Sequence, residues 1–247
     1  MYKLLTIFFV FLIIFIVIYV NNSNYVFENF ENSENIVHLY WTGGFDSTFR
    51  LCQALIDEHK IVQPIYISDI IDNLPQKNTR RHNLNFELMA MKNIRNVLNK
   101  KYKFTKRTLL PLINIKKVII DDDINYHMKI LKSQGRVRRA VCQYGAMAQI
   151  TRNLNKNIEI CVENEPGSML NRTMKNKLNC YTSNNCVIKN NLSKKDKSLY
   201  IFKKFIFSTI KYTKKNMLNI AKRSGYDDIL KLTWSCWYPV NNKPCGK

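Results

Sequence analysis

The sequence lacks the cysteine framework of a small secreted protein. Its seven cysteines are an odd number, and they are scattered rather than gathered into closely spaced pairs. They stand at positions 52, 142, 161, 180, 186, 236 and 245. Because no even, compact set is present, we expect reduced thiols, with a subset of them available to bind metal.

Acidic residues are also scarce. The chain has 18 Asp and Glu against 39 Lys and Arg, for a net charge of +21. Residues 1–40 hold one lysine and three glutamates, so the rest of the chain carries +23. Proteins this basic often meet polyanions such as RNA, anionic lipid or nucleotide. The lysines are spread along the whole chain, however, which fits a general richness in Lys, Asn and Ile equally well, so nucleic acid is allowed as a partner but not specified.

Charge is absent from residues 4–20, which are apolar or aromatic except for Thr6. The run is short for a membrane span and long for the core of a signal peptide. No cleavage site of small residues follows it. We therefore predict an uncleaved transmembrane anchor at residues 1–21, followed by a polar spacer at 22–35. A buried core helix is the alternative.

Beyond residue 35, short apolar runs alternate with longer helical periodicities. We predict strands at 36–41, 61–67 and 158–162, and helices at 47–58, 82–99, 124–132, 138–153 and 213–224. This alternation predicts an α/β domain at 36–165 with a doubly wound, mostly parallel sheet. A polar insertion at 166–200 is expected to form a long loop, and 201–247 a small C-terminal helical part. Pro64 favours a place near the sheet edge for the second strand.

The first predicted strand leads into a loop that is suited to phosphate. It reads Thr42-Gly43-Gly44-Phe45-Asp46-Ser47-Thr48 and opens the first helix. Adjacent glycines allow a tight turn that aims backbone N–H groups at an oxyanion, and the helix N-terminus adds partial positive charge. Ser47 and Thr48 offer hydroxyls, and Asp46 suits a magnesium ion held against phosphate oxygens. A hairpin turn would explain Gly-Gly alone, and the Gly-Lys-Ser/Thr ending of a Walker loop is missing.

This segment resembles the PP-loop of the ATP pyrophosphatases, Ser-Gly-Gly-x-Asp-Ser, with Thr42 in place of the first serine. The resemblance implies an adenine nucleotide alpha hydrolase-like fold and cleavage of ATP between its α- and β-phosphates, with magnesium. It implies Asp46 and Ser47 as catalytic residues. The nucleotide-binding residues that it implies are Thr42, Gly43, Gly44, Phe45, Asp46, Ser47, Thr48 and Asp69.

A second motif, Thr-Trp-Ser-Cys at residues 233–236, is followed after eight residues by Cys245-Gly246. With the loop, it resembles the 7-cyano-7-deazaguanine synthases, in which four cysteines bind zinc. Cys236 and Cys245 match two of the four, and the third would fall after Lys247. The sequence is therefore expected to be a fragment or its zinc site incomplete. Four thiolates make a closed, structural zinc site, while spacing alone would equally suit two unrelated cysteines.

The resemblance implies an enzyme of queuosine biosynthesis that uses ATP to convert 7-carboxy-7-deazaguanine and ammonia into a nitrile. A homodimer is compatible with this family resemblance. Residues 163–168 stand where the family carries Asp-Cys-Arg, so the acceptor is less specified than the use of ATP. Arg136, Arg138 and Arg139 are candidates for pyrophosphate or the substrate carboxylate, or form a solvated basic loop. The triplet at 121–123 is expected to be a solvated helix start rather than a metal site.

Two other functions stay open. One is a PP-loop enzyme that adenylates tRNA, which the basic body favours. The other is a membrane-tethered nucleotide-binding protein without catalysis, which the anchor and the missing cysteines favour. The side of the membrane on which the rest of the chain lies is also open. Lys3 is the only Lys or Arg before Arg50, so the positive-inside rule places the N-terminus in the cytosol and the rest of the chain on the other side. ATP chemistry and free thiols favour a cytosolic body, and we give them more weight than one lysine.

Overall fold

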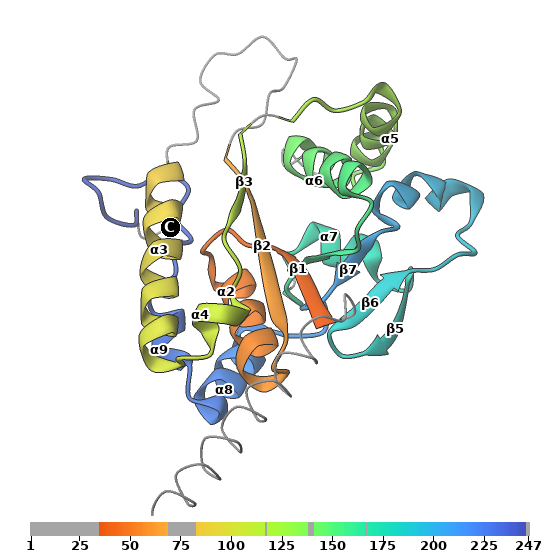
Figure 1. Ribbon diagram of the computed structural model, residues 1–247. Helices are drawn as coiled ribbons and strands as arrows, with labels where there is room; N and C mark the ends of the chain where they lie inside the picture. Colours follow the sequence, from red (N-terminus) through yellow and green to blue (C-terminus); the bar gives the residue numbers. More distant parts are fainter. Residues whose placement is uncertain (1–34, 69–82, 117, 138–140, 166, 246–247) are drawn as a thin grey trace, which may run out of the picture. The chain divides into compact units, whose positions relative to one another are not determined.

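The computed structural model describes residues 35–68, 83–116, 118–137, 141–165 and 167–245 (Figure 1). The chain divides into two compact units, Met1–Ile36 and Val37–Lys247, and the second is described below. The predicted anchor and all of the spacer except Asn35 lie outside the described residues. Within the described ranges, no helix is long and apolar enough to span a membrane.

A five-stranded sheet forms the centre of the second unit. Its strands are β1 (Ile36–Tyr40), β2 (Ile61–Ile67), β3 (Ile113–Ile115), β4 (Ile158–Ile160) and β7 (Phe205–Phe207), in the order β3-β2-β1-β4-β7. The pairs β2–β3, β1–β4 and β4–β7 are parallel. The predicted α/β class and mostly parallel sheet are confirmed. The order reverses at β1, which creates a switch point between β1 and β4.

Helices cover both faces of this sheet (Figure 1). One face carries α2 (Phe45–Cys52) with its π-helical continuation η2 (Gln53–Asp57), α3 (Leu84–Lys101), α8 (Lys214–Ser224) and α9 (Asp227–Leu230). The other face carries α5 (Asp122–Ser133), α6 (Val141–Leu154), α7 (Met169–Met174) and the 3₁₀ segment η3 (Lys194–Phe202). The short α4 (Thr105–Thr108) lies between α3 and β3 in the chain.

Alternation along β1 explains the two hydrophobic clusters. Leu39 and Trp41 pack with Phe49 of α2 on one face, whereas Tyr40 between them packs with Phe205 on the other. Successive side chains of a strand point to opposite faces, so an apolar run without alternation is what a sheet covered on both sides requires. Each large side chain buried this way contributes about 1.5–3 kcal/mol.

Helix α8 begins and ends where the sequence predicts. Thr213 accepts a hydrogen bond from the backbone N–H of Asn216, whose side chain in turn bonds the backbone of Thr213. This reciprocal cap satisfies two N–H groups that the helix leaves free. Gly225 ends the helix at φ +76°, a left-handed conformation that glycine adopts without a Cβ clash.

Two predictions about residues 166–200 are wrong. This polar stretch contains α7, the antiparallel hairpin of β5 (Leu178–Thr182) and β6 (Asn185–Ile188), and η3 instead of one long loop. The hairpin register places Cys180 opposite Cys186, and the two form a disulfide, contrary to the expected reduced thiols. Cys52, Cys161, Cys236 and Cys245 are free thiols, as predicted.

The position of β2 also differs from the prediction, since it lies between β3 and β1 rather than at an edge. The sheet tolerates Pro64 because its missing N–H falls between the bridge at Val62–Leu109 and the start of β3. The side chain of Gln63 donates to the carbonyls of Pro64 and Pro111 and closes this gap.

The aspartates at 121–123 stand at the start of α5, as expected. Asp121 occupies the N-cap position, and Arg152 of α6 forms ion pairs with Asp123 at 2.6 Å and with Asp121 at 3.5 Å. All three partners are at least 42% exposed, so these pairs add little stability. They connect α5 to α6.

Arg50 is almost completely buried, at 1% exposure. Its guanidinium donates to both carboxylate oxygens of Glu159 in β4, at 2.5 and 2.9 Å, and to Glu58 at 2.5 and 3.0 Å. The two carboxylates more than offset the effect of burial and raise the pKa of Arg50. The bidentate pair fixes α2 against β4, the two elements that flank the switch point.

Candidate active site

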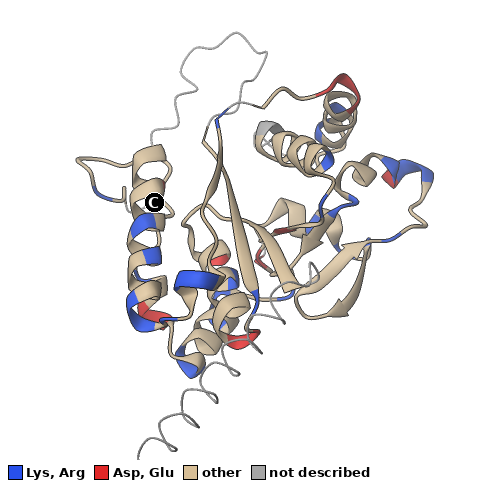
Figure 2. Ribbon diagram, viewed as in Figure 1, with Lys and Arg blue, Asp and Glu red and all other residues tan. Residues whose placement is uncertain are grey.

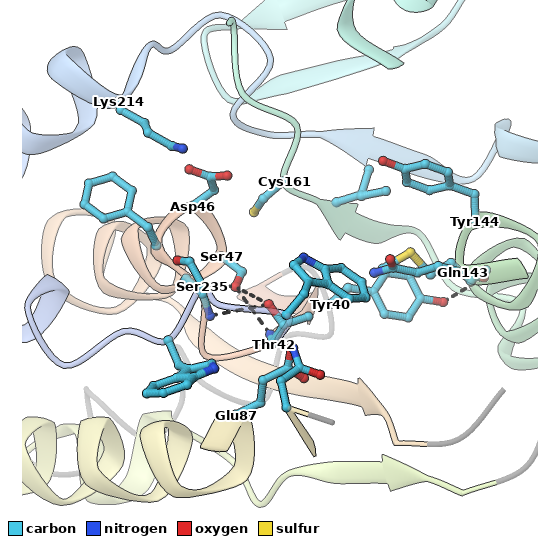
Figure 3. Close-up of a pocket in the computed structure, with 17 residues that line it drawn as sticks. Tyr40, Thr42, Asp46, Ser47, Glu87, Gln143, Tyr144, Cys161, Lys214 and Ser235 are labelled. Atoms are coloured by element: carbon cyan, nitrogen blue, oxygen red, sulfur yellow. Dashed lines mark hydrogen bonds between the residues drawn. The ribbon is translucent and has the colours of Figure 1, made fainter. Parts of the chain in front are cut away.

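A pocket of about 260 Å³ opens at the carboxyl ends of β1 and β4, next to the N-terminus of α2 (Figure 3). This is the switch point at which open α/β sheets bind ligands. Its walls come from β1, the loop after it, α3, α6, β4, α8 and the segment after α9. The lining residues are Tyr40, Thr42, Gly44, Phe45, Asp46, Ser47, Asn83, Glu87, Gln143, Tyr144, Met147, Ile160, Cys161, Lys214, Trp234, Ser235 and Trp237.

The glycines of the loop are required by its geometry. Gly43 has φ +70°, and a Cβ there would lie 3.0 Å from Cγ of Met91 and 3.1 Å from the carbonyl oxygen of Glu87. A Cβ on Gly44 would lie 3.2 Å from Oγ1 of Thr42. The loop therefore packs against α3 so closely that only glycine fits at 43 without displacement.

Hydroxyl groups organise the inner side of the loop. The N–H of Thr42 donates to Oγ of Ser47 at 3.3 Å, and the N–H of Gly44 donates to Oγ1 of Thr42 at 3.4 Å. Thr42 and Ser47 both line the pocket. Thr48 is placed differently, because its Oγ1 accepts from the indole of Trp41 at 3.1 Å and its side chain is buried in the core.

Asp46 lies in the first turn of α2 with its carboxylate in the pocket wall. Its Oδ1 is buried and has no hydrogen-bond partner among the described residues. Burial, with further contributions from Glu163 and Glu165, raises the pKa of Asp46 to about 6, and Lys214 opposes this shift. The ammonium of Lys214 points toward Asp46 (Figure 3) and pairs with Glu163 at 3.1 Å.

These residues fit a magnesium ion. An unpartnered buried carboxylate oxygen is costly unless a cation or donor completes it. Asp46 supplies that oxygen, and Glu163 and Glu165 concentrate negative charge around it. Hard oxygen ligands of this kind are what Mg²⁺ prefers, with substrate phosphates completing its coordination.

The opposite wall contains residues that the sequence reasoning missed. Glu87 of α3 accepts from the hydroxyl of Tyr66 at 2.5 Å and from the amide of Asn83 at 2.8 Å. Gln143 and Tyr144 enter from α6 (Figure 3). The sequence spacing of Glu87, Gln143 and Tyr144 does not predict a shared site, because they come together only when α3 and α6 pack in the fold. Only the helical periodicity of 82–99 and 138–153 pointed to their elements.

Cys161 follows β4 and also lines the pocket. Burial is the main reason that the pKa of its thiol is raised, with Glu159 and Asp46 adding to the effect. Its Sγ lies 3.8 Å from Oγ of Ser208. At neutral pH it is therefore an uncharged wall of the cavity beside the Asp46 carboxylate (Figure 3).

The two sequence motifs meet at this pocket. The N–H of Trp234 donates to the carbonyl of Gly43 at 3.0 Å, and its indole stacks on Phe86 of α3 with ring centroids 4.5 Å apart. Ser235 and Trp237 join the lining. The Thr-Trp-Ser-Cys segment thus forms part of the wall beside the glycine turn.

Cys236 and Cys245 also lie together, with Sγ atoms 3.3 Å apart. A tight turn with Asn241 and Asn242 at positive φ brings them close, bridged at Val240–Lys243. The N–H of Cys245 donates to Sγ of Cys236 and lowers the pKa of Cys236. In the described part of the chain, no group of three or more His, Cys, Asp or Glu is arranged to hold a metal. Cys236 and Cys245 are two thiols, whereas a closed zinc site takes four ligands.

Of the remaining candidates, only Arg136 is described, and it does not line the pocket. Asp69, Arg138 and Arg139 lie outside the described residues. Arg136 pairs with the buried carboxylate of Asp196 at 2.7 Å, an ion pair that ties the segment after α5 to η3. Comparison with known proteins gives no match to any family model or any curated protein. The function is therefore inferred from the site's own residues.

Proposed function

We propose that the protein is an ATP-dependent adenylating enzyme with its phosphate site at residues 42–48. The observation that carries this proposal is the unpartnered buried carboxylate of Asp46, placed in the first turn of α2 beside a left-handed glycine turn. A phosphate chain with a divalent cation would satisfy both features at once. The strand order supports the finer proposal of an adenine nucleotide alpha hydrolase-like fold.

Each residue has a role in this proposal. The N–H groups at the start of α2 and the hydroxyls of Thr42 and Ser47 bind and orient the phosphates. Asp46 holds magnesium, which neutralises charge on the phosphates when bound. Lys214, across from Asp46, attracts the negative charge that develops on the departing pyrophosphate. Glu87, fixed by Tyr66 and Asn83, faces the acceptor.

The proposed substrate is 7-carboxy-7-deazaguanine. A carboxylate oxygen attacks the α-phosphorus of ATP, the bond to the β-phosphate oxygen breaks, and pyrophosphate leaves. Ammonia then displaces AMP to give an amide, with a proton lost from nitrogen. The amide oxygen then attacks the α-phosphorus of a second ATP and releases pyrophosphate. This oxygen leaves with AMP while the nitrogen loses its two protons, which gives the nitrile. The polar and aromatic residues Gln143, Tyr144 and Trp237 suit a planar, hydrogen-bonding heterocycle.

The proposal extends to two other parts of the chain. Cys236 and Cys245 supply two thiolates of a zinc site, which has a structural role only. Residues 1–21 anchor the protein in a membrane, with the catalytic body in the cytosol. Both are tested separately from the chemistry, by zinc content and by membrane fractionation.

A pyrophosphate-release assay tests the proposed reaction. With ATP, Mg²⁺ and ammonium, 7-carboxy-7-deazaguanine should stimulate release, and mass spectrometry should find the nitrile. Release with bulk tRNA but not with the acid would instead identify a tRNA-adenylating enzyme, which the absence of Asp-Cys-Arg at 163–168 keeps open. Binding of ATP without release on either substrate would refute an adenylating function and leave a nucleotide-binding protein.

A further inference from the structure

A second recessed surface lies outside the candidate active site. Two hollows of about 980 and 800 Å³ adjoin one another and share Lys211 in the segment between β7 and α8. The first is bordered by α7, β5 and the residues before α8, and the second by the face of α8. We call the two together the basic groove.

The charge of this groove is almost entirely positive. Its lining includes six cationic side chains against one carboxylate, that of Glu165. The cations are Arg172, Lys175, Lys189, Lys211, Lys222 and Arg223. Among described residues, Lys175, Lys211, Lys222 and Arg223 have no ion-pair partner, and all four are exposed. They are drawn among the blue positions of Figure 2.

The groove reaches the edge of the active site. Glu165 and Thr213 line its near end, and Lys214, the next residue, lines the pocket that contains Asp46. The N–H of Lys214 donates to the carboxylate of Glu165 at 3.3 Å, so the two sites share a wall. From Thr213 to Arg223 the helix extends the groove by about 15 Å.

We infer that the basic groove binds single-stranded nucleic acid, with its cations on successive phosphates and one end of the strand beside the active-site pocket. The inference goes beyond the proposed function and does not depend on it. A positively charged groove that follows a flexible backbone is the usual way to hold a single strand. Tyr212 on the groove wall adds a half-buried ring, which its hydroxyl bond to Ser183 of the hairpin loop holds in place.

The shape of the surface favours this ligand over an anionic membrane. A bilayer presents its phosphates in one plane, whereas these cations line two hollows, one beside α7 and β5 and the other along α8. A strand of nucleic acid enters such hollows because its backbone bends at every nucleotide. The Cys180–Cys186 disulfide braces the hairpin that forms one border, which keeps the groove open before binding.

Fluorescence anisotropy with the full chain in nonionic detergent tests the inference. The probe is a labelled oligouridine of about 16 nucleotides, with oligothymidine for comparison. The double variant Lys211→Gln and Arg223→Gln should bind about 25-fold more weakly at about 0.1 M salt, because two phosphate contacts each change the salt exponent by about 0.7. The matched control, Lys129→Gln with Lys132→Gln on exposed positions of α5, should bind as the wild type does.

The salt dependence separates a groove from general charge. We expect the slope of log affinity against log salt to become shallower by about 1.4 in the groove variant and to stay unchanged in the control variant. This result would support the inference. Equal losses in both double variants would overturn it, as would failure of the wild type to bind either oligonucleotide. Preferential binding to phosphatidylserine vesicles or polyglutamate, lost in the groove variant, would overturn it in favour of a lipid or an acidic protein. Unchanged thermal unfolding confirms that the variants are folded.

Discussion

The phosphate loop (residues 42–48) and the cysteine hairpin (residues 236–245) are built in different ways. The loop is set into the core, where Gly43 packs against α3 and Thr48 is fully buried. The hairpin lies at the surface, with Tyr238 70% exposed and Val240 59% exposed. Packing fixes the loop, whereas the contacts of the hairpin include its own turn, a thiol contact and the indole N–H of Trp234, which donates to the carbonyl of Cys236.

In the proposed function, the phosphate loop takes part in the reaction and the cysteine hairpin has a structural role. The loop carries a buried carboxylate oxygen that has no hydrogen-bond partner among the described residues, and the proposed function assigns this oxygen to magnesium. Trp234, which precedes the hairpin, makes the contact with the loop through its backbone N–H. We therefore expect changes in the loop to affect catalysis strongly and changes at the cysteines to affect it weakly.

The largest effect is expected from Asp46→Asn. Pyrophosphate release should fall by about 100-fold or more, because the variant loses the charge that holds magnesium. The matched control is Asp122→Asn, an exposed aspartate in the first turn of α5. It should keep full activity. Wild-type rates in Asp46→Asn would contradict the magnesium assignment.

The same variant has a pH signature in stability. Because the pKa of Asp46 is raised to about 6 in the folded protein, the folded state holds this proton more tightly than the unfolded chain does. Stability should therefore fall as pH rises from about 4 to about 6, by up to about 3 kcal/mol. Asp46→Asn should remove this part of the pH dependence in urea unfolding, and Asp122→Asn should not.

The next largest effect is a difference in the loss of folding stability between alanine substitutions at two glycines. Gly43 and Gly135 both have positive φ, +70° and +66°, so alanine at either should cost about 1–2 kcal/mol in conformational strain. Only Gly43 has neighbours within 4 Å of the added Cβ, and crowding there should add about 1–3 kcal/mol. Denaturant unfolding measures both. Equal losses would show that the loop accommodates a side chain.

A smaller effect is expected where the two regions touch. A double-mutant cycle with Phe86→Leu and Trp234→Leu should give a coupling of about 0.5–1.5 kcal/mol for the stacked pair. The apparent KM for ATP should rise in Trp234→Leu, because loss of the stack on Phe86 loosens the segment whose backbone N–H bonds the carbonyl of Gly43. No coupling would mean that the segment after α9 does not support the loop.

The smallest effect on stability is expected at Cys236 of the cysteine hairpin. Cys236→Ser should change the free energy of unfolding by less than about 0.5 kcal/mol without metal, as for a surface substitution. Cys52→Ser, which puts a hydroxyl into the core, should cost about 1–3 kcal/mol. A rise in the wild-type Tm on adding Zn²⁺ that Cys236→Ser abolishes would show that the pair binds metal, and no rise would refute zinc binding by these residues.

Local signals made part of this fold predictable. The limits of β2 and α8 agree with the sequence prediction because an apolar run, a threonine cap and Gly225 act within a few residues. The turn between β1 and α2 was predictable for the same reason, since a strand, two glycines and a helix start are consecutive. Its membership of the pocket wall is observed for Thr42, Gly44 and Asp46.

Non-local features were not predictable. The polar composition of 166–200 hid the hairpin, because β5 is largely exposed and lacks the apolar alternation that signals a strand. The Cys180–Cys186 disulfide follows from that hairpin's register and from no spacing rule. Glu87 and Lys214 enter the site from helices on separate parts of the chain, and sequence patterns within each helix carry no sign of their meeting.

The parallel pairing of β1 with β4 has a consequence for how the protein is made. Leu39 pairs with Glu159, and the carbonyl of Gly43 accepts a hydrogen bond from the N–H of Trp234, so both partners come much later in the sequence. A chain emerging from the ribosome therefore carries its phosphate loop long before the loop's partners exist, and such distant pairings form slowly. Nucleotide affinity should appear only once the segment after α9 has been synthesised and docked, so ligand binding can serve as a reporter of completed folding.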